Sequence, residues 1–316
     1  KDFEITSDFN LNRTRTIQVN SPEIINGSLK GKFRINDLPD LIRNSLGDIY
    51  TNFNPFLDID DQYLNFNFKI YSKIMELFYP DIKLGPNTSV KGRLESDPNK
   101  FKLTFKSPTI EMDHFYADKI KVQLINDNPL FNSYIEVDSL ETKYYNVSEF
   151  SLINVILNDT LYVKSEFKGG EESKDIFDLN LYYTTNEANK SVIGVKKSTA
   201  IFKEIPWLIN SSQDGPNTIT FDRDFKEVLV DNLMMSFADE EIRLNALVES
   251  SGNSSLDLEF KDVDISKVTP SIKNLKLDGN LNGSLNISKT QSIYLPKSSL
   301  TIDDFKVNDF NLGSFK

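Results

Sequence analysis

Alternating apolar and polar residues mark a strand near the end of the chain. Over residues 277–287 every second residue is apolar or glycine, and every residue between is polar. This period of two is typical of a β-strand with one dry face and one wet face. The same pattern recurs near the start of the chain, again with two glycines four positions apart. The dry faces carry Ile25, Gly27, Leu29, Gly31 and Phe33 in the early strand and Leu277, Gly279, Leu281, Gly283, Leu285 and Ile287 in the late one.

Similar alternation predicts further strands along the chain. Polar turns rich in Asn, Asp, Gly and Pro separate them, for example at residues 97–99, 168–170 and 250–253. Strands at this spacing, joined by polar turns, predict antiparallel meanders in an all-β fold. The clearest strand centres are residues 64–70, 101–105, 120–124, 161–167, 179–183, 242–248, 256–260 and 300–302.

Helical spacing is scarce by comparison. Residues 37–50 have apolar positions at helical intervals, with Asn36 or Asp37 as the expected N-cap. A shorter helix is predicted over residues 72–79, ended by the proline that follows. A third helical piece is expected around residues 206–208. The first two helices are expected to pack on the dry face of a sheet.

Composition and charge narrow the function classes. Of 316 residues, 39% are hydrophobic and 26% charged, which is typical of a folded chain. The 36 basic residues against 47 acidic ones leave a net charge of −11. This balance argues against nucleic acid as a partner and against simple electrostatic docking on anionic headgroups. The absence of cysteine excludes disulfides and thiolate metal sites.

The chain is expected to be one piece of a longer protein. No apolar run of about 18 residues is present, so no membrane-spanning helix is predicted. Alternation continues to the last residues, through Phe310, Leu312 and Phe315. We therefore interpret residues 1–316 as a fragment of one elongated β-protein, with a possible soft boundary near residues 187–197.

Catalytic and metal-binding patterns are weak. His114 is the only histidine, and no Gly-x-Ser-x-Gly elbow accompanies it, so a loop histidine is the simpler interpretation. The acidic cluster of Asp58, Asp60 and Asp61 lacks EF-hand spacing and is interpreted as a solvated turn. We expect no enzymatic activity, no catalytic or metal-ligating residues and no cofactor.

The dry faces pose a physical problem, because too few helices are predicted to cover them. A second sheet, giving a sandwich or closed barrel, is one cover, and the pattern alone favours it. The other is a sheet curled into an elongated groove that lipid chains occupy. Each buried CH₂ group would contribute roughly 0.8 kcal/mol there. In that groove the glycines would be notches, and Phe66, Phe68, Leu103, Leu244 and Leu258 would join the lining.

Four phrases in the last third of the chain carry a family resemblance. They are residues 258–270 (LEFKDVDISKVTP), the glycine-spaced strand 275–287, the phrase 300–305 (LTIDDF), and residues 307–313, which close on Leu-Gly. Together they resemble the TamB family within the AsmA-like bridge proteins. The front half is more loosely similar, over residues 66–105, to TamB-like proteins of Bacteroidota. The resemblance implies a curled antiparallel sheet, a β-taco, with an apolar interior.

The resemblance also implies a function in the cell envelope. Such proteins carry phospholipid across the periplasm of Gram-negative bacteria and support outer-membrane protein assembly. The implied partners are phospholipid acyl chains, the inner membrane through an N-terminal anchor, and an outer-membrane barrel of the BamA or TamA type through a C-terminal region. Neither of those regions lies in this chain. A structural or adhesive all-β surface protein without a ligand is the alternative.

Overall fold

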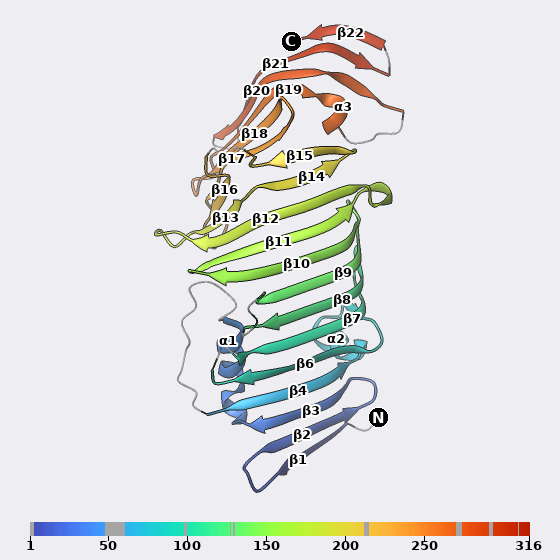
Figure 1. The fold of residues 1–316 in the computed structure, drawn as a ribbon, viewed down its shortest axis with the longest axis vertical. Coiled ribbons are helices and arrows are strands. Elements are labelled where there is room, and N and C mark those ends of the chain that lie inside the picture. The colour runs from blue at the N-terminus through green and yellow to red at the C-terminus, as the bar shows by residue number, and fades with distance from the viewer. Residues whose placement is uncertain are drawn as a thin grey trace. The chain divides into compact units, whose positions relative to one another are not determined.

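The protein is an antiparallel all-β structure. The computed structural model describes residues 3–47, 61–97, 100–126, 128, 130–211, 215–269, 274–290, 293–308 and 310–316. Over these residues it contains twenty-two β-strands and three short α-helices, so the all-β prediction is confirmed (Figure 1). The chain divides into two compact units, Lys1–Ser173 and Lys174–Lys316, which are described separately. Residues 187–197 lie within the second unit.

The first unit is a meander in which strands follow one another in sequence order. Its polar turns are short, and short turns join antiparallel neighbours. Two of its strands, β5 and β6, lie end to end along β7. The strands are β1 (Glu4–Phe9), β2 (Arg15–Ser21), β3 (Ile25–Lys32), β4 (Tyr63–Ile70), β5 (Ile82–Leu84), β6 (Thr88–Glu95), β7 (Lys102–Met112), β8 (Phe115–Ile125), β9 (Ser133–Thr142), β10 (Val147–Leu157) and β11 (Thr160–Gly169).

The second unit continues the same principle with two interrupted strands. β13 and β14 both pair with β12, and β15 and β16 both pair with β17, so each pair lies end to end. The strands are β12 (Asp175–Thr185), β13 (Ser191–Val195), β14 (Ser198–Phe202), β15 (Ile205–Ile209), β16 (Thr218–Phe221), β17 (Val228–Phe237), β18 (Glu240–Val248), β19 (Ser254–Asp264), β20 (Leu277–Thr290), β21 (Ile293–Val307) and β22 (Phe310–Phe315).

Two of the three predicted helices are present. α1 (Leu38–Gly47) follows a 3₁₀ turn at Ile35–Asp37 and agrees with the predicted helix as far as the described residues reach. α2 (Ser72–Phe78) agrees with the predicted short helix and ends just before Pro80. Both helices follow strands of the first unit, and Figure 1 shows them beside its sheet.

The third helical prediction was wrong. Residues 206–208 lie inside β15, where Trp207 faces the core and its neighbours do not, as strand alternation requires. The third helix is instead α3 (Ile265–Val268), a single turn after β19. The Asp264 carboxylate caps it by accepting a hydrogen bond from the Ser266 N–H at 2.9 Å.

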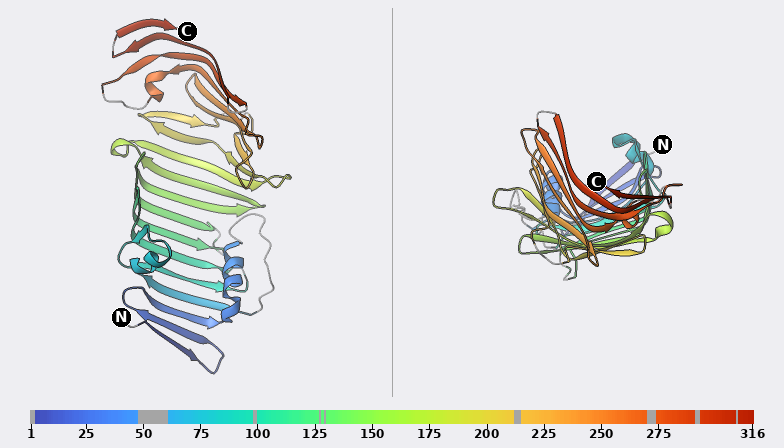
Figure 2. Two further views of the ribbon diagram at one scale, coloured as in Figure 1. Left: turned by 180° about the vertical axis from the view of Figure 1, so that it is seen from behind. Right: turned by 90° about the horizontal axis from the view of Figure 1, so that it is seen from above.

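Single extra residues with a positive φ interrupt the register of four strands. These residues are Glu149 in β10, Asn232 in β17, Asp262 in β19 and Asp304 in β21, and all four have φ between 50° and 55°. A bulge of this kind bends its strand and increases the local twist. The bulges therefore bend β10 in the first unit and β17, β19 and β21 in the second, and Figure 2 shows that the long strands follow a curved course.

Candidate functional site

Rows of apolar side chains cross the sheet of the first unit. Directly paired residues in an antiparallel sheet share a face, so the register identifies each row. One row consists of Val19, Gly27, Phe68, Val90, Phe105, Val122, Ile135 and Leu152. A parallel row consists of Ile17, Leu29, Phe66, Gly92, Leu103, Leu124, Ser133, Asn154 and Val163. We name the face that carries these rows the inner face of the first unit.

The predicted lining residues of the first unit gather on this inner face. Phe33 continues the alternation of β3 beyond its last residue and is buried. Shared register thus brings together residues that lie up to 78 positions apart in the sequence, from Ile25 to Leu103. The set comprises Ile25, Gly27, Leu29, Gly31, Phe33, Phe66, Phe68 and Leu103.

An equivalent inner face exists in the second unit. Its rows are Val230, Ala246, Leu256 and Ile287, and Leu233, Leu244, Leu258 and Leu285. They contain four of the predicted lining residues, Leu244, Leu258, Leu285 and Ile287. Gly283 pairs with Phe260 and Leu281 with Val263 on the same side, while Leu277 pairs with Val307 at the end of β20, two residues before Gly279.

The inner face of the first unit is covered only in part. Substantial contacts between strands all join neighbours within the sheet, as expected for a single layer. α1 covers one end of the strands, where Leu41 packs with Phe33, Leu64, Leu94 and Phe101 in a buried cluster. α2 lies at the other end, beside β5. Between them, the middle of the face is half-buried.

The exposed area agrees with a single layer. The chain has 19699 Å² of solvent-accessible surface. Two separate compact proteins of half its mass would together expose only about 16,000 Å². The difference is apolar in part, because most row residues keep some contact with solvent. The second sheet that a sandwich would supply is not found among the described residues.

The glycines on the inner faces do not leave open space. A methyl group at Gly27, Gly31 or Gly283 would overlap a carbonyl oxygen of the neighbouring strand. One at Gly279 would lie 2.9 Å from Ile302 Cγ2. The interpretation of these glycines as notches for a ligand is therefore corrected: the adjacent strand fills the space. Gly279 and Gly283 also have φ of 140° and 114°, where other residues are strained.

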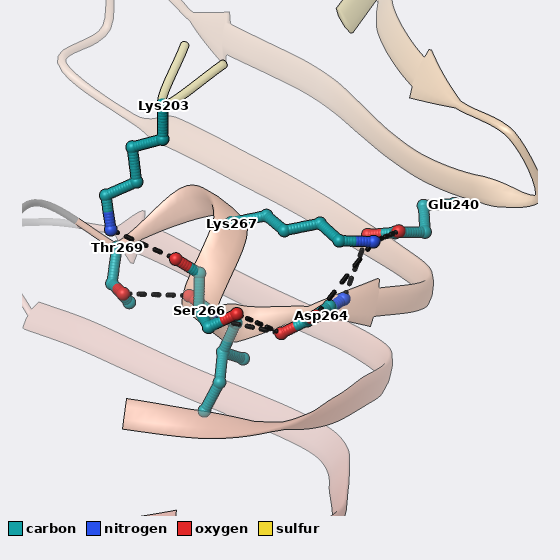
Figure 3. Close-up of polar contacts among 7 residues, drawn as sticks. Lys203, Glu240, Asp264, Ser266, Lys267 and Thr269 are labelled. Atoms are coloured by element: carbon teal, nitrogen blue, oxygen red, sulfur yellow. Dashed lines mark hydrogen bonds and ion pairs between the residues drawn. The ribbon is translucent and has the colours of Figure 1, made fainter. Parts of the chain in front are cut away.

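In the second unit, α3 sits at one end of the inner face. Trp207 is 1% exposed and its ring centroid lies 6.1 Å from that of Phe237. The Lys267 ammonium of α3 lies 5.1 Å from the Phe237 centroid and also pairs with Glu240. Lys203, from the turn between β14 and β15, donates to the Ser266 carbonyl at 3.0 Å (Figure 3). These contacts hold the single helical turn in place.

Replacing Lys267 by Met should destabilise the protein by about 2 kcal/mol, because Glu240 is mostly buried and would lose its cation. Urea denaturation measures the change. Lys226→Met is the matched control, since Lys226 and its partner Asp224 are both largely exposed, and should cost less than about 0.5 kcal/mol. Equal losses in the two variants would show that the Glu240 pair does not hold α3.

A hollow lies at the turns of the second unit, where β17 and β18 bring Val228 and Val248 to the end of the inner rows. It has a volume of about 590 Å³, and an ion pair between Lys190 and Glu227 crosses its rim at 2.5 Å. The hydrogen bond from Lys190 lowers the pKa of Glu227. In the same turn the Glu227 N–H donates to Asp222 at 2.7 Å and lowers the pKa of Asp222. These carboxylates are held ionised, which suits turn stabilisation rather than proton transfer.

The Asp222 carboxyl should titrate below its ordinary value of 3.8 when followed by NMR. Its contribution to stability is present above that value and is lost as pH falls through the lower, folded-state pKa. Exchange of the Glu227 amide proton should accelerate over the same range, because protonation weakens the hydrogen bond. A titration midpoint at or above 3.8 would contradict this prediction.

The other residues considered for chemistry lie apart from the inner faces. His114 lies in the exposed turn between β7 and β8, as predicted, with its nearest carboxylate, that of Asp113, at 3.6 Å. Asp61 pairs with Lys32, while Asp58 and Asp60 fall outside the described residues. The described residues contain no group of three or more His, Asp or Glu side chains placed to hold a metal ion.

No helix within the described part of the chain has the length and apolarity needed to cross a membrane.

Sequence reasoning missed several members of the rows. Val90, Phe105 and Val122 lie at the centre of the inner face but were not assigned to the lining. The alternation in β7 and β8 shows that the apolar residues of each strand share one face, but it does not show that this is the face on which the apolar residues of β3 lie. Arg15, on the inner side of β2, was also missed.

Comparison with known proteins yields no relative: no protein-family model, curated protein or solved structure matches the chain.

Proposed function

We propose that this chain is a segment of a lipid conduit, in which hydrocarbon chains lie along the apolar rows of the inner faces. The observation that carries the proposal is the first row of the inner face. From Val19 to Leu152 it crosses eight strands without a charged residue, on a sheet that has one layer. Such a face needs a cover, and its middle is left half-buried by α1 and α2.

The dimensions of the row support a hydrocarbon chain as that cover. Neighbouring strands are about 4.8 Å apart, so eight strands span roughly 34 Å. The hydrocarbon of one bilayer leaflet is about 15 Å thick, so the row accommodates an acyl chain with length to spare. Each CH₂ group removed from water contributes about 0.8 kcal/mol. The gain accumulates along the row without any directional contact.

The mechanism we infer is passive. Acyl chains slide across rungs of similar apolarity, so no position traps them, and headgroups stay in water. The outer face suits contact with water, because it carries ion pairs such as Lys119–Asp138 at 2.6 Å and Lys121–Glu136 at 3.5 Å. No covalent step or cofactor is required.

The TamB resemblance extends the proposal to a cellular role. In that role the chain lies in the periplasm of a Gram-negative bacterium and carries phospholipid between the inner and outer membranes. The membrane anchor and the outer-membrane barrel partner would belong to other parts of a longer protein. These assignments rest on the sequence phrases and on the single-layer apolar sheet that such a protein needs.

Native mass spectrometry of the purified chain tests the proposal. Phospholipid should remain bound, and Phe105→Arg should reduce the bound lipid about tenfold or more, because a charge would sit in the middle of the row. The fold should survive, since Phe105 is half-buried and an Arg side chain reaches water from such a site. Circular dichroism and thermal melting check this.

Thr104→Arg is the matched control, because it adds the same charge one residue away on the outer face. It should leave lipid retention within about twofold of wild type. Lipid-free protein, or equal retention in both variants, would reject the conduit and favour a structural or adhesive surface protein.

A further inference from the structure

Arg15 is a charged residue on the inner face of the first unit, beside the rows that cross β2, β3 and β4. It pairs with Phe9 of β1 on one side and with Gly31 of β3 on the other, so its side chain shares the face of the rows. Along β2, β3, β4 and β6 the other inner positions are apolar, glycine or uncharged polar residues. A guanidinium in this position lies beside the apolar rows rather than in the charged outer face.

The Arg15 side chain lacks a carboxylate partner within the described part of the chain. Its guanidinium stacks on the Phe9 ring at 4.4 Å from the centroid, and its Nε is buried with no hydrogen-bond partner. Outer-face lysines differ, since Lys119, Lys121 and Lys168 each have a carboxylate on the neighbouring strand. A buried donor without an acceptor costs free energy, which an anionic oxygen would recover.

We propose that Arg15 binds the anionic phosphate headgroup of a phospholipid whose acyl chains lie on the inner face. The inference rests on the proposed function and adds the headgroup class and the residue that selects it. Guanidinium presents a planar fork of donors that matches phosphate oxygens. Ile17, the next inner residue of β2, packs against the buried cluster around Leu41. A molecule that binds beside Arg15 therefore needs hydrocarbon next to its anionic group. This requirement favours a lipid over free phosphate.

Arg15 would select anionic lipid through a direct contact rather than through long-range electrostatic attraction. The chain as a whole carries a net charge of −11, which disfavours anionic lipid at long range. A preference for anionic lipid therefore has to come from a specific contact, and Arg15 offers one beside the rows of β2, β3 and β4. Its neighbour Phe9 is 62% exposed, so the site is open to an incoming headgroup.

The test is a competition between two lipids with the same acyl chains. The purified chain is incubated with equal amounts of dioleoyl phosphatidylglycerol and dioleoyl phosphatidylcholine, and native mass spectrometry measures the ratio bound. Wild type should favour the anionic lipid about tenfold, as expected for a charge-assisted contact. Arg15→Gln should bring the ratio close to one while keeping phosphatidylcholine binding within about twofold.

Lys30→Gln is the matched control, because it removes the same charge from the outer face of β3 and should keep the preference. Equal binding of both lipids by wild type, or a preference that survives in Arg15→Gln, would overturn the headgroup inference while leaving the conduit intact. Absence of any bound lipid would instead reject the conduit itself. An excess of inorganic phosphate that removes the anionic preference at Arg15 would identify a free-phosphate site and overturn the lipid assignment.

Discussion

Gly31→Ala should lower the free energy of unfolding by about 3 kcal/mol, measured by urea denaturation. Gly31 is buried beside Leu64, and an added methyl group would overlap the carbonyl oxygen of Tyr63 in β4. Relief requires that β3 move away from β4, which weakens the hydrogen bonds of the ladder. Because α1 packs on this end of the sheet, the displacement should also loosen its Leu41 contact.

Gly252→Ala is the matched control, because it introduces backbone strain without a steric overlap. Gly252 lies in the turn between β18 and β19, has φ of 83°, and has no atom within 4 Å of an added methyl group. Only strain applies there, so the expected loss is about 1 kcal/mol. A loss in Gly31→Ala no greater than in Gly252→Ala would mean that β3 and β4 adjust freely, and that the close approach has no structural role.

Asn217→Ala should cost about 3–4 kcal/mol, the largest effect we expect in the second unit. Asn217 is fully buried where β15 and β16 meet. Its Nδ2 donates to Asn210 Oδ1 at 3.0 Å, and its Oδ1 accepts from the Met234 N–H at 3.2 Å. The substitution leaves both partners buried and unsatisfied. It also places alanine at φ of 47°, a conformation that asparagine tolerates better.

Asn189→Ala is the matched control for this second prediction. Asn189 has a similar φ of 57° but lies exposed in the turn between β12 and β13. Its replacement removes the backbone preference without exposing a buried network, so a loss of about 1 kcal/mol is expected. Comparable losses in the two variants would show that the Asn217 hydrogen bonds contribute little.

The Asn217 network also explains an irregularity of the sheet. The Val195 N–H donates to the Asn217 carbonyl at 2.9 Å, and Asn210 Nδ2 donates to the Val195 carbonyl at 2.7 Å. Both asparagines thus hold the same residue of β13. β16 resumes the line of β15 along β17, so the sheet continues across this junction.

Alternation along the chain was enough to predict the fold class and the two inner faces. Side chains of a strand point to opposite sides at a period of two, whatever the tertiary context. For that reason the sequence predicts one apolar face each for β3 and β20, and the register pairs apolar residues of these strands with apolar residues of β2 and β19. The helices α1 and α2 were also predictable from the local sequence, because apolar positions at helical spacing define both and Pro80 follows the second.

Other features depended on distant partners. A helical piece was expected around Trp207, yet pairing with β14 and contact with Phe237 place this residue in a strand. The bulges at Asn232 and Asp262 shift the apolar alternation by one residue, from Val230 to Leu233 and from Phe260 to Val263, but the shift alone does not show which neighbouring strand accommodates it. Pairing energy across strands, rather than local propensity, decides such positions.

The sequence by itself determined that β3 and β20 have one apolar face each, because the period of their apolar residues is intrinsic to the chain. Only the tertiary structure decided what covers that face. Register aligned the rows, placed Arg15 beside them, and packed backbone against Gly31 where the sequence suggested an open notch. These outcomes follow from which strands become neighbours, and the pattern within a single strand carries no information about its neighbour.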